Sequence, residues 1–128
     1  MSKILVIDDN DLFRQYVVTL LERAGYEVVA LRDGSRVKSV LLSEQIDAIV
    51  SDLYMPNIDG LEVLALKRQY APTAPVIGIS GGSYKSADPC LKAMQVLGAT
   101  AVLKKPIDGN VFLAILRDAL IRHPRATA

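Results

Sequence analysis

The sequence of 128 residues lacks the features that mark several classes of protein. Its single cysteine, Cys90, excludes an internal disulfide and a cysteine-based metal site. Fifteen Lys and Arg against fourteen Asp and Glu leave a net charge of +1, so no bulk field attracts nucleic acid or a membrane surface. No apolar run approaches the ~18 residues of a membrane span, and the N-terminal run is too short for a signal peptide. These absences predict one globular domain in the cytoplasm.

What the sequence does contain is an alternation of short apolar runs with segments of helical periodicity. The runs show no polar–apolar alternation, which favours strands buried on both faces, as in a parallel sheet. They are Ile4–Ile7, Val28–Leu31, Ala48–Val50, Pro75–Ile79 and Ala101–Leu103. The helical stripes are Phe13/Val17/Leu20/Leu21/Ala24, Val37/Val40/Leu41, Leu61/Leu64/Ala65, Cys90/Ala93/Met94/Leu97 and Phe112/Ile115/Leu116/Ala119. This order predicts an α/β fold, a doubly wound (βα)5 open parallel sheet.

Residues at the helix ends support these assignments. Gly25 and Gly98 follow the first and fourth stripes and predict helix stops. Asp88, followed by Pro89, predicts the start of the fourth helix, and Asp108 predicts the N-cap of the fifth.

Polar side chains follow four of the five predicted strands. Asp8 and Asp9 come after the first strand, Asp52 after the third, Ser80 after the fourth and Lys105 after the fifth. In open α/β sheets ligands bind at the carboxyl ends of the strands, so these side chains are expected to share one site.

The residue types limit the chemistry of that site. Three neighbouring carboxylates repel one another unless a cation intervenes. Oxygen ligands in small number suit Mg²⁺, and a lysine suits the phosphate oxygens that complete the shell of this ion. With a carboxylate as nucleophile, the natural product is an aspartyl phosphate.

Plainer interpretations exist for each of these residues. Asp8 and Asp9 could cap the first helix, Asp52 could open a turn, Ser80 could belong to a flexible loop, and Lys105 could be a solvated surface residue. The exposed face of the first helix, including Arg14, could contact a kinase or could simply be solvated.

Four segments carry a resemblance to a known family. ILVIDD, DLYMPNIDG, IGISGG and VLKKP, in this order at strand ends, resemble the receiver domain of two-component response regulators. The resemblance implies a flavodoxin-like fold with strand order 2-1-3-4-5, covering nearly the whole chain. It divides the sequence into a receiver domain over residues 1–121 and a short tail over residues 122–128, without an output domain.

The resemblance implies a role for each matching position. Asp52 is the phosphoacceptor. Asp8, Asp9, Asp52 and the backbone carbonyl of Tyr54 hold Mg²⁺. The remaining roles fall on Ser80 and Lys105, which contact the phosphoryl group, and on the Lys105–Pro106 peptide bond, which is cis in the family.

Two departures from the family pattern bear on switching and on phosphoryl lifetime. Val102 stands three residues before Lys105, where the family usually has Tyr or Phe, so the aromatic switch is absent. Tyr54 and Gly82 occupy positions where the family tunes dephosphorylation. Because a Tyr hinders the attacking water and a Gly offers no side chain to orient it, a moderately long-lived phosphoryl group is expected.

The function implied is a phosphorelay switch. The donor is a phosphohistidine of a sensor kinase or of a histidine phosphotransfer protein, and a downstream protein binds the face formed by helix 4, strand 5 and helix 5. Dimerisation on phosphorylation is compatible with the resemblance. No separate substrate is turned over, so the domain is not an enzyme in the usual sense.

Three other functions are compatible with parts of the sequence. A pseudo-receiver would act as an interaction module without phosphorylation. A haloacid-dehalogenase-type phosphatase also forms an aspartyl phosphate, but its D-x-D motif is not met at Asp8-Asp9-Asn10. Dinucleotide binding is poorly supported because the first turn has no glycine.

Overall fold

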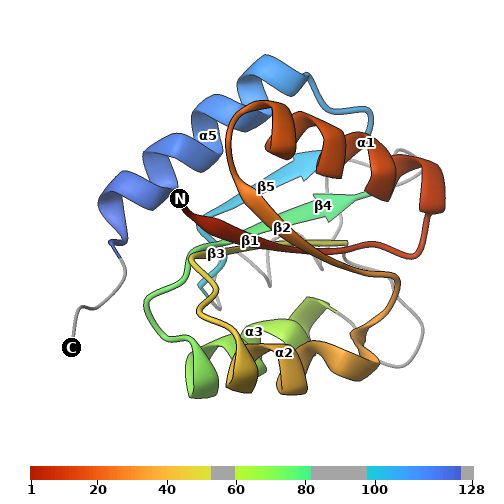
Figure 1. Cartoon of the computed structure of the whole chain (residues 1–128). Helices are drawn as coiled ribbons and strands as arrows, with labels where there is room; N and C mark the ends of the chain where they lie inside the picture. The colour runs from red at the N-terminus through yellow and green to blue at the C-terminus, as the bar shows by residue number, and fades with distance from the viewer. Residues whose placement is uncertain (53–59, 82–97, 125–128) are drawn as a thin grey trace.

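The computed structural model describes residues 1–52, 60–81 and 98–124 and shows a five-stranded parallel sheet (Figure 1). The strand order is β2-β1-β3-β4-β5, which confirms the predicted flavodoxin-like α/β topology. The strands are β1 Lys3–Ile7, β2 Glu27–Leu31, β3 Ala48–Asp52, β4 Val76–Ser80 and β5 Ala101–Lys104. All lie within two residues of their predicted bounds.

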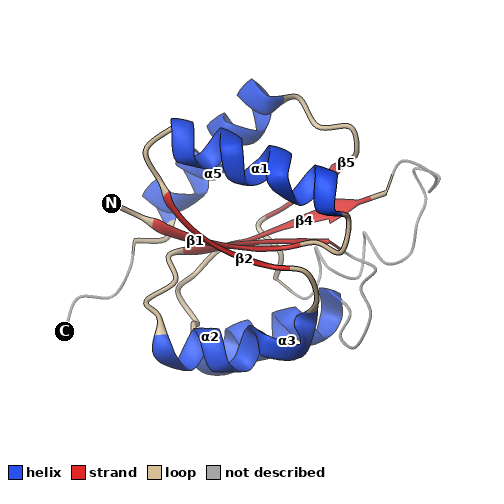
Figure 2. Cartoon of the chain, turned by 45° about the vertical axis from the view of Figure 1, so that its right-hand side comes forward, coloured by secondary structure: helices blue, strands red, loops and turns tan. Residues whose placement is uncertain are grey.

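Helices cover both faces of the sheet in a three-layer arrangement (Figure 2). On one face lie α1 (Asp11–Arg23) and α5 (Gly109–Arg122); on the other lie α2 (Val37–Ser43) and α3 (Gly60–Tyr70). A short 3-10 helix, η1 (Gly34–Arg36), precedes α2. The helix predicted around Cys90 lies outside the described residues.

The core is divided into two apolar clusters by the sheet. Alternate strand residues point to opposite faces. Ile4, Val6 and Val50 therefore join the cluster beneath α1 and α5, which includes the fully buried Phe112. Leu5, Ile7 and Ile49 join the cluster beneath α2 and α3. Burial on both faces explains why the strands read as continuous apolar runs.

Two residues assigned to apolar helical stripes are exposed in the structure. In α3, Val63 and Leu64 are buried, whereas Ala65, predicted in the apolar stripe, is exposed. The side chain of Leu61, also predicted in this stripe, lies outside the described ones. Ala24 is likewise exposed, because α1 ends at Arg23 and Ala24 forms its C-cap. A small alanine adds little to an apolar stripe, so its place in the stripe was a weak indicator of burial.

The helix ends mostly follow the predictions. Asp108 accepts hydrogen bonds from the backbone N–H groups of Asn110 and Val111, which confirms it as the N-cap of α5. Gly25 and Gly98 have φ angles of 94° and 113°, a region that disfavours other residues. Within the described part of the chain, none of the helices is long and apolar enough to cross a bilayer.

Candidate functional site

The strand register places the acidic residues at the ends of β1 and β3 next to each other. Ile7 of β1 is paired with Ser51 of β3, so Asp8 and Asp52, one residue further along each strand, lie side by side. The N–H of Asp8 still donates to the Leu31 carbonyl, at 3.1 Å, which extends the sheet pairing by one residue. Both aspartates therefore sit on rigid backbone at the carboxyl end of the sheet.

Asp8, Asp9 and Asp52 form an acidic triad. One carboxylate oxygen from each residue lies within 4.8 Å of the other two. Asp8 and Asp52 are buried, at 2% and 6% exposure, whereas Asp9 is exposed. Two carboxylates held this close with little water around them repel each other strongly, and the arrangement favours a cation.

Lys105 supplies one positive charge to the triad. Its Nζ lies 3.0 Å from Oδ2 of Asp8 and 3.8 Å from Oδ2 of Asp52. The backbone N–H of Lys105 donates to the carbonyl of Ser80 at 2.8 Å, which continues the pairing of β4 with β5. The Lys105–Pro106 peptide bond is cis. The plainer interpretation of Lys105 as a solvated residue is wrong, since its side chain is 19% exposed and ion-paired.

The donor set fits a small dication. Oδ2 of Asp8 is buried and makes no hydrogen bond, although the Lys105 ammonium lies beside it. A buried carboxylate oxygen without a hydrogen bond is costly, and a metal ion would satisfy it. Within the described part of the chain, the group consists of three carboxylates without a nitrogen or sulfur ligand, which matches the preference of Mg²⁺ for oxygen. The residues present therefore suit the predicted ion.

A family model for the response regulator receiver domain matches residues 4–117. The chain belongs to this family. It is similar to the CAI-1 autoinducer sensor kinase/phosphatase CqsS of Vibrio cholerae, with 38% identity over 114 residues, 87% of this chain and 16% of that protein. It is also similar to a protein-glutamate methylesterase/protein-glutamine glutaminase of Archaeoglobus fulgidus, with 33% identity over 127 residues, 98% and 36% of the two chains.

Solved structures agree with the family assignment. A receiver domain from Clostridium thermocellum is 30% identical with a TM-score of 0.79, covering 95% of this chain and 96% of that one. A response regulator from Burkholderia pseudomallei, solved with a phosphorylated aspartic acid, a calcium ion and citrate, is 27% identical with a TM-score of 0.81, covering 95% and 70%. The chain spans 16% and 36% of the two curated relatives named above.

The turn that carries the acidic pair of this receiver is held by Asn10 and Arg14, whose local roles were not predicted from the sequence. Asn10, not Asp8 or Asp9, is the N-cap of α1, and its side chain accepts from the N–H of Phe13 at 2.9 Å. Asp8 instead accepts from the N–H of Asn10 through Oδ1, at 2.8 Å. The helix-cap interpretation of Asp8 and Asp9 is therefore wrong. An Asn three residues before the first residue of the helical stripe was the available signal.

Arg14 also stabilises this turn through hydrogen bonds. One guanidinium nitrogen donates to the backbone carbonyl of Asp8 at 2.9 Å, and another donates to Asp11 at 2.7 Å. That hydrogen bond and the charge of Arg14 hold the pKa of the Asp11 carboxyl below its usual value. Arg14 was expected on an exposed face, but its side chain is only 21% exposed and turns toward the site.

The remaining predicted positions of the receiver are placed as follows. Ser80 is fully buried at the end of β4, and its Oγ donates to the carbonyl of Gly81 at 3.3 Å. Val102 is half-buried and packs against the cluster beneath α2 and α3. Tyr54 and Gly82 lie outside the described residues.

An open pocket of about 570 Å³ adjoins the receiver's acidic site. It lies between the start of α1 and the segment that follows β5. Its lining residues are Asn10, Leu12, Phe13, Tyr16, Lys105, Pro106 and Ile107. Leu12 is 85% exposed and Tyr16 is 43% exposed, so the rim presents apolar surface to solvent. Lys105 therefore lies both in the acidic site and at the pocket.

Proposed function

We propose that Asp52 accepts a phosphoryl group from a phosphohistidine. The observation that carries this proposal is the buried carboxylate of Asp52, held close to two further carboxylates and 3.8 Å from the Lys105 ammonium. A structural aspartate at a strand end does not require this concentration of charge. The phosphorylated aspartic acid in the Burkholderia pseudomallei structure supports the proposal by similarity.

The transfer is a single displacement at phosphorus. A carboxylate oxygen of Asp52 attacks the phosphorus and forms an O–P bond. The P–N bond to the donor imidazole breaks, and its electron pair goes to the imidazole nitrogen. The reaction depends on positioning and on neutralising the phosphoryl oxygens rather than on a general acid or base.

The metal ion would be held by Asp8, Asp9 and Asp52, together with the Tyr54 carbonyl that the family pattern implies. When bound, Mg²⁺ supplies charge neutralisation to the phosphoryl oxygens. Lys105 places an ammonium within reach of the same oxygens, and Ser80 offers a hydroxyl at the adjacent strand end. The new dianion then competes for Ser80 and Lys105 and shifts the loops that follow β4 and β5.

The partners follow from this chemistry. A sensor kinase or a histidine phosphotransfer protein presents the phosphohistidine and covers the apolar pocket between α1 and the segment after β5. A downstream protein binds the altered surface formed by β5, α5 and the helix predicted around Cys90, and the same change can drive dimerisation. We place the receiver domain at residues 1–121 and its action in the cytoplasm. Because the domain modifies only itself, we do not class it as an enzyme.

Phosphate incorporation from a small donor tests the proposal. The wild-type protein is incubated with acetyl phosphate and Mg²⁺, and the phosphorylated residue is identified by mass spectrometry. We expect stoichiometric labelling of Asp52 and none after Asp52→Asn. Unchanged labelling of the variant would exclude Asp52 as the acceptor, and absence of labelling in the wild type would favour a pseudo-receiver. Repeated turnover of phosphomonoesters would indicate a phosphatase instead.

The lifetime of the phosphoryl group is a second readout of the same preparation. Tyr54 and Gly82 lead us to expect slow hydrolysis in Mg²⁺ buffer. A half-life of only seconds would contradict this expectation and leave the acceptor assignment intact.

A further inference from the structure

Lys105 makes a third contact, with an aromatic ring from another element. Its Nζ lies 4.4 Å from the centroid of the Phe13 ring, which belongs to α1. Asp8 and Asp52, the other two contacts, come from the ends of β1 and β3. We propose that Phe13 is a positioning residue, which holds the Lys105 ammonium where it meets the phosphoryl group. This inference rests on the proposed function of the site.

The ring is well suited to fix a flexible side chain. Phe13 is half-buried and packs against the cluster beneath α1 and α5, and its ring meets that of Tyr16 at 6.2 Å and 51°. A cation over the face of a fixed ring is attracted by the ring's negative face. A Lys side chain has four rotatable bonds and loses much conformational freedom when it is ordered. An ammonium already held by the ring can therefore contact the phosphoryl group without this entropic cost.

The need for such a contact follows from the metal site. Oδ2 of Asp8, the carboxylate oxygen nearest to Lys105, is also the buried oxygen that the structure leaves for a metal ion. A dication at that oxygen weakens the attraction between Asp8 and Lys105, because the charge of Asp8 is then shared. The Phe13 ring is not a metal ligand, so its contact with Lys105 persists when the carboxylates are engaged.

The test compares variants with and without an aromatic ring at position 13. Phe13→Leu keeps an apolar helix-forming residue and removes the ring face, whereas Phe13→Tyr keeps the face. Tyr26→Leu is the control, because Tyr26 is another aromatic residue that packs against the cluster beneath α1 and α5, and it neither lines the pocket nor makes a described contact with Lys105. Acetyl phosphate is the donor, since Phe13 lines the surface proposed for the donor protein.

Phe13→Leu is expected to slow phosphorylation of Asp52 about two- to thirtyfold. Phe13→Tyr and Tyr26→Leu should stay within about twofold of the wild type. A double-mutant cycle identifies the route. In a Lys105→Met background, Phe13→Leu should cause no further loss, because the ammonium that the ring holds is gone. Phe13→Met replaces Phe13→Leu should the latter fail to fold by circular dichroism.

A spectroscopic readout is independent of the reaction and of the metal. In metal-free protein, the ring current of Phe13 should shift the Lys105 Cε protons in the NMR spectrum. The shift should be lost in Phe13→Leu and retained in Phe13→Tyr and Tyr26→Leu.

Three results would overturn the inference: Phe13→Leu at the wild-type rate, an equal loss in Tyr26→Leu, or the same loss from Phe13→Leu in the Lys105→Met background. In each case labelling of Asp52 in the wild type would still support the proposed function. Absence of wild-type labelling would instead reject that function, and the NMR shift would still decide whether the ring holds the ammonium.

Discussion

Each end of β1 carries a cluster of one lysine and two carboxylates, but only one of the two clusters has the properties of a functional site. At the first residue of the strand, the Lys3 ammonium lies 2.7 Å from Glu44 and 3.7 Å from Glu27. Just past the other end, Lys105 lies 3.0 Å from Asp8 and 3.8 Å from Asp52. Each cluster therefore has one lysine between two carboxylates at nearly equal distances.

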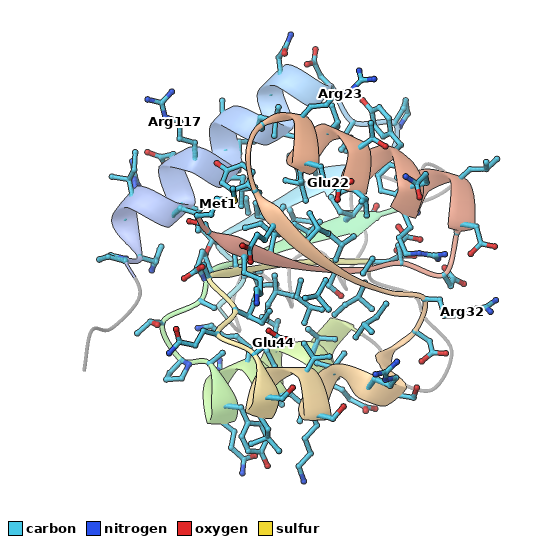
Figure 3. The ribbon with its side chains drawn as sticks, viewed as in Figure 1. Met1, Glu22, Arg23, Arg32, Glu44 and Arg117 are labelled. Carbon is cyan, nitrogen blue, oxygen red and sulfur yellow. The ribbon has the colours of Figure 1, made fainter. Side chains whose placement is uncertain are left out.

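The difference lies in exposure and in hydrogen bonding. Glu44, labelled in Figure 3, and Glu27 have side chains 39% and 55% exposed, whereas those of Asp8 and Asp52 are 3% and 7% exposed. The backbone N–H of Lys3 donates to Asp47 at 2.8 Å and completes the first cluster. In the second cluster, Asp8 retains a buried oxygen with no hydrogen bond. Ion-pair distance alone does not distinguish a stabilising cluster from a reactive one.

Removing each lysine is the largest expected contrast. Lys105→Met should lower the rate of Asp52 phosphorylation by acetyl phosphate on the order of a hundredfold, as loss of one charged group facing a developing charge does. Lys3→Met should leave the rate unchanged, because Lys3 lies at the opposite end of the strand. Rates are measured from phosphoprotein formation at saturating Mg²⁺. Equal losses in both variants would mean that the effect is one of stability.

Removing one carboxylate from each cluster should change stability in opposite directions. Asp52 faces two carboxylates and one ammonium, so Asp52→Asn should raise the metal-free unfolding free energy by about 1 kcal/mol after the opposing contributions largely cancel. Glu44→Gln removes an attraction and should lower the melting temperature by no more than about 3 °C. Urea and thermal unfolding without Mg²⁺ measure both. A destabilised Asp52→Asn would show that the buried site stores no repulsion.

The smallest expected effect is the pH dependence of the Lys3 cluster. The hydrogen bond to Glu44, and then the charges of Glu44 and Glu27, raise the pKa of Lys3 above its ordinary value of 10.5. A raised pKa contributes stability that is present below 10.5 and is lost as the pH rises through the folded-state value. The difference in melting temperature between wild type and Lys3→Met should thus be constant from about pH 6 to pH 9 and shrink above 10.5. A difference that grows at high pH would contradict this assignment.

The sequence predicted the strands and the strand-end residues well because both depend on short-range pattern. Five apolar runs required a buried parallel sheet, and residues such as Asp8 and Asp52 then had to meet at one edge. The resemblance added the strand order and the proposed role of each position.

What the sequence could not provide was the direction of individual side chains. Arg14 turns inward to the Asp8 carbonyl, and Phe13 lies under Lys105, yet both belong to a helix whose stripe alone does not show which residue reaches the site. Asn10 is the N-cap of α1, a role considered for Asp8 and Asp9, because N-capping depends on the backbone conformation at the turn rather than on charge.

The Mg²⁺ dependence of the unfolding free energy tests the central claim most directly, namely that the buried cluster is built to receive a dication. For the wild type and for Glu44→Gln, the unfolding free energy should rise by about 1.4 kcal/mol for each tenfold increase in Mg²⁺ above the dissociation constant. Asp8→Asn should show almost no rise over the same range. A flat response in the wild type, or an equal slope in Asp8→Asn, would contradict the account.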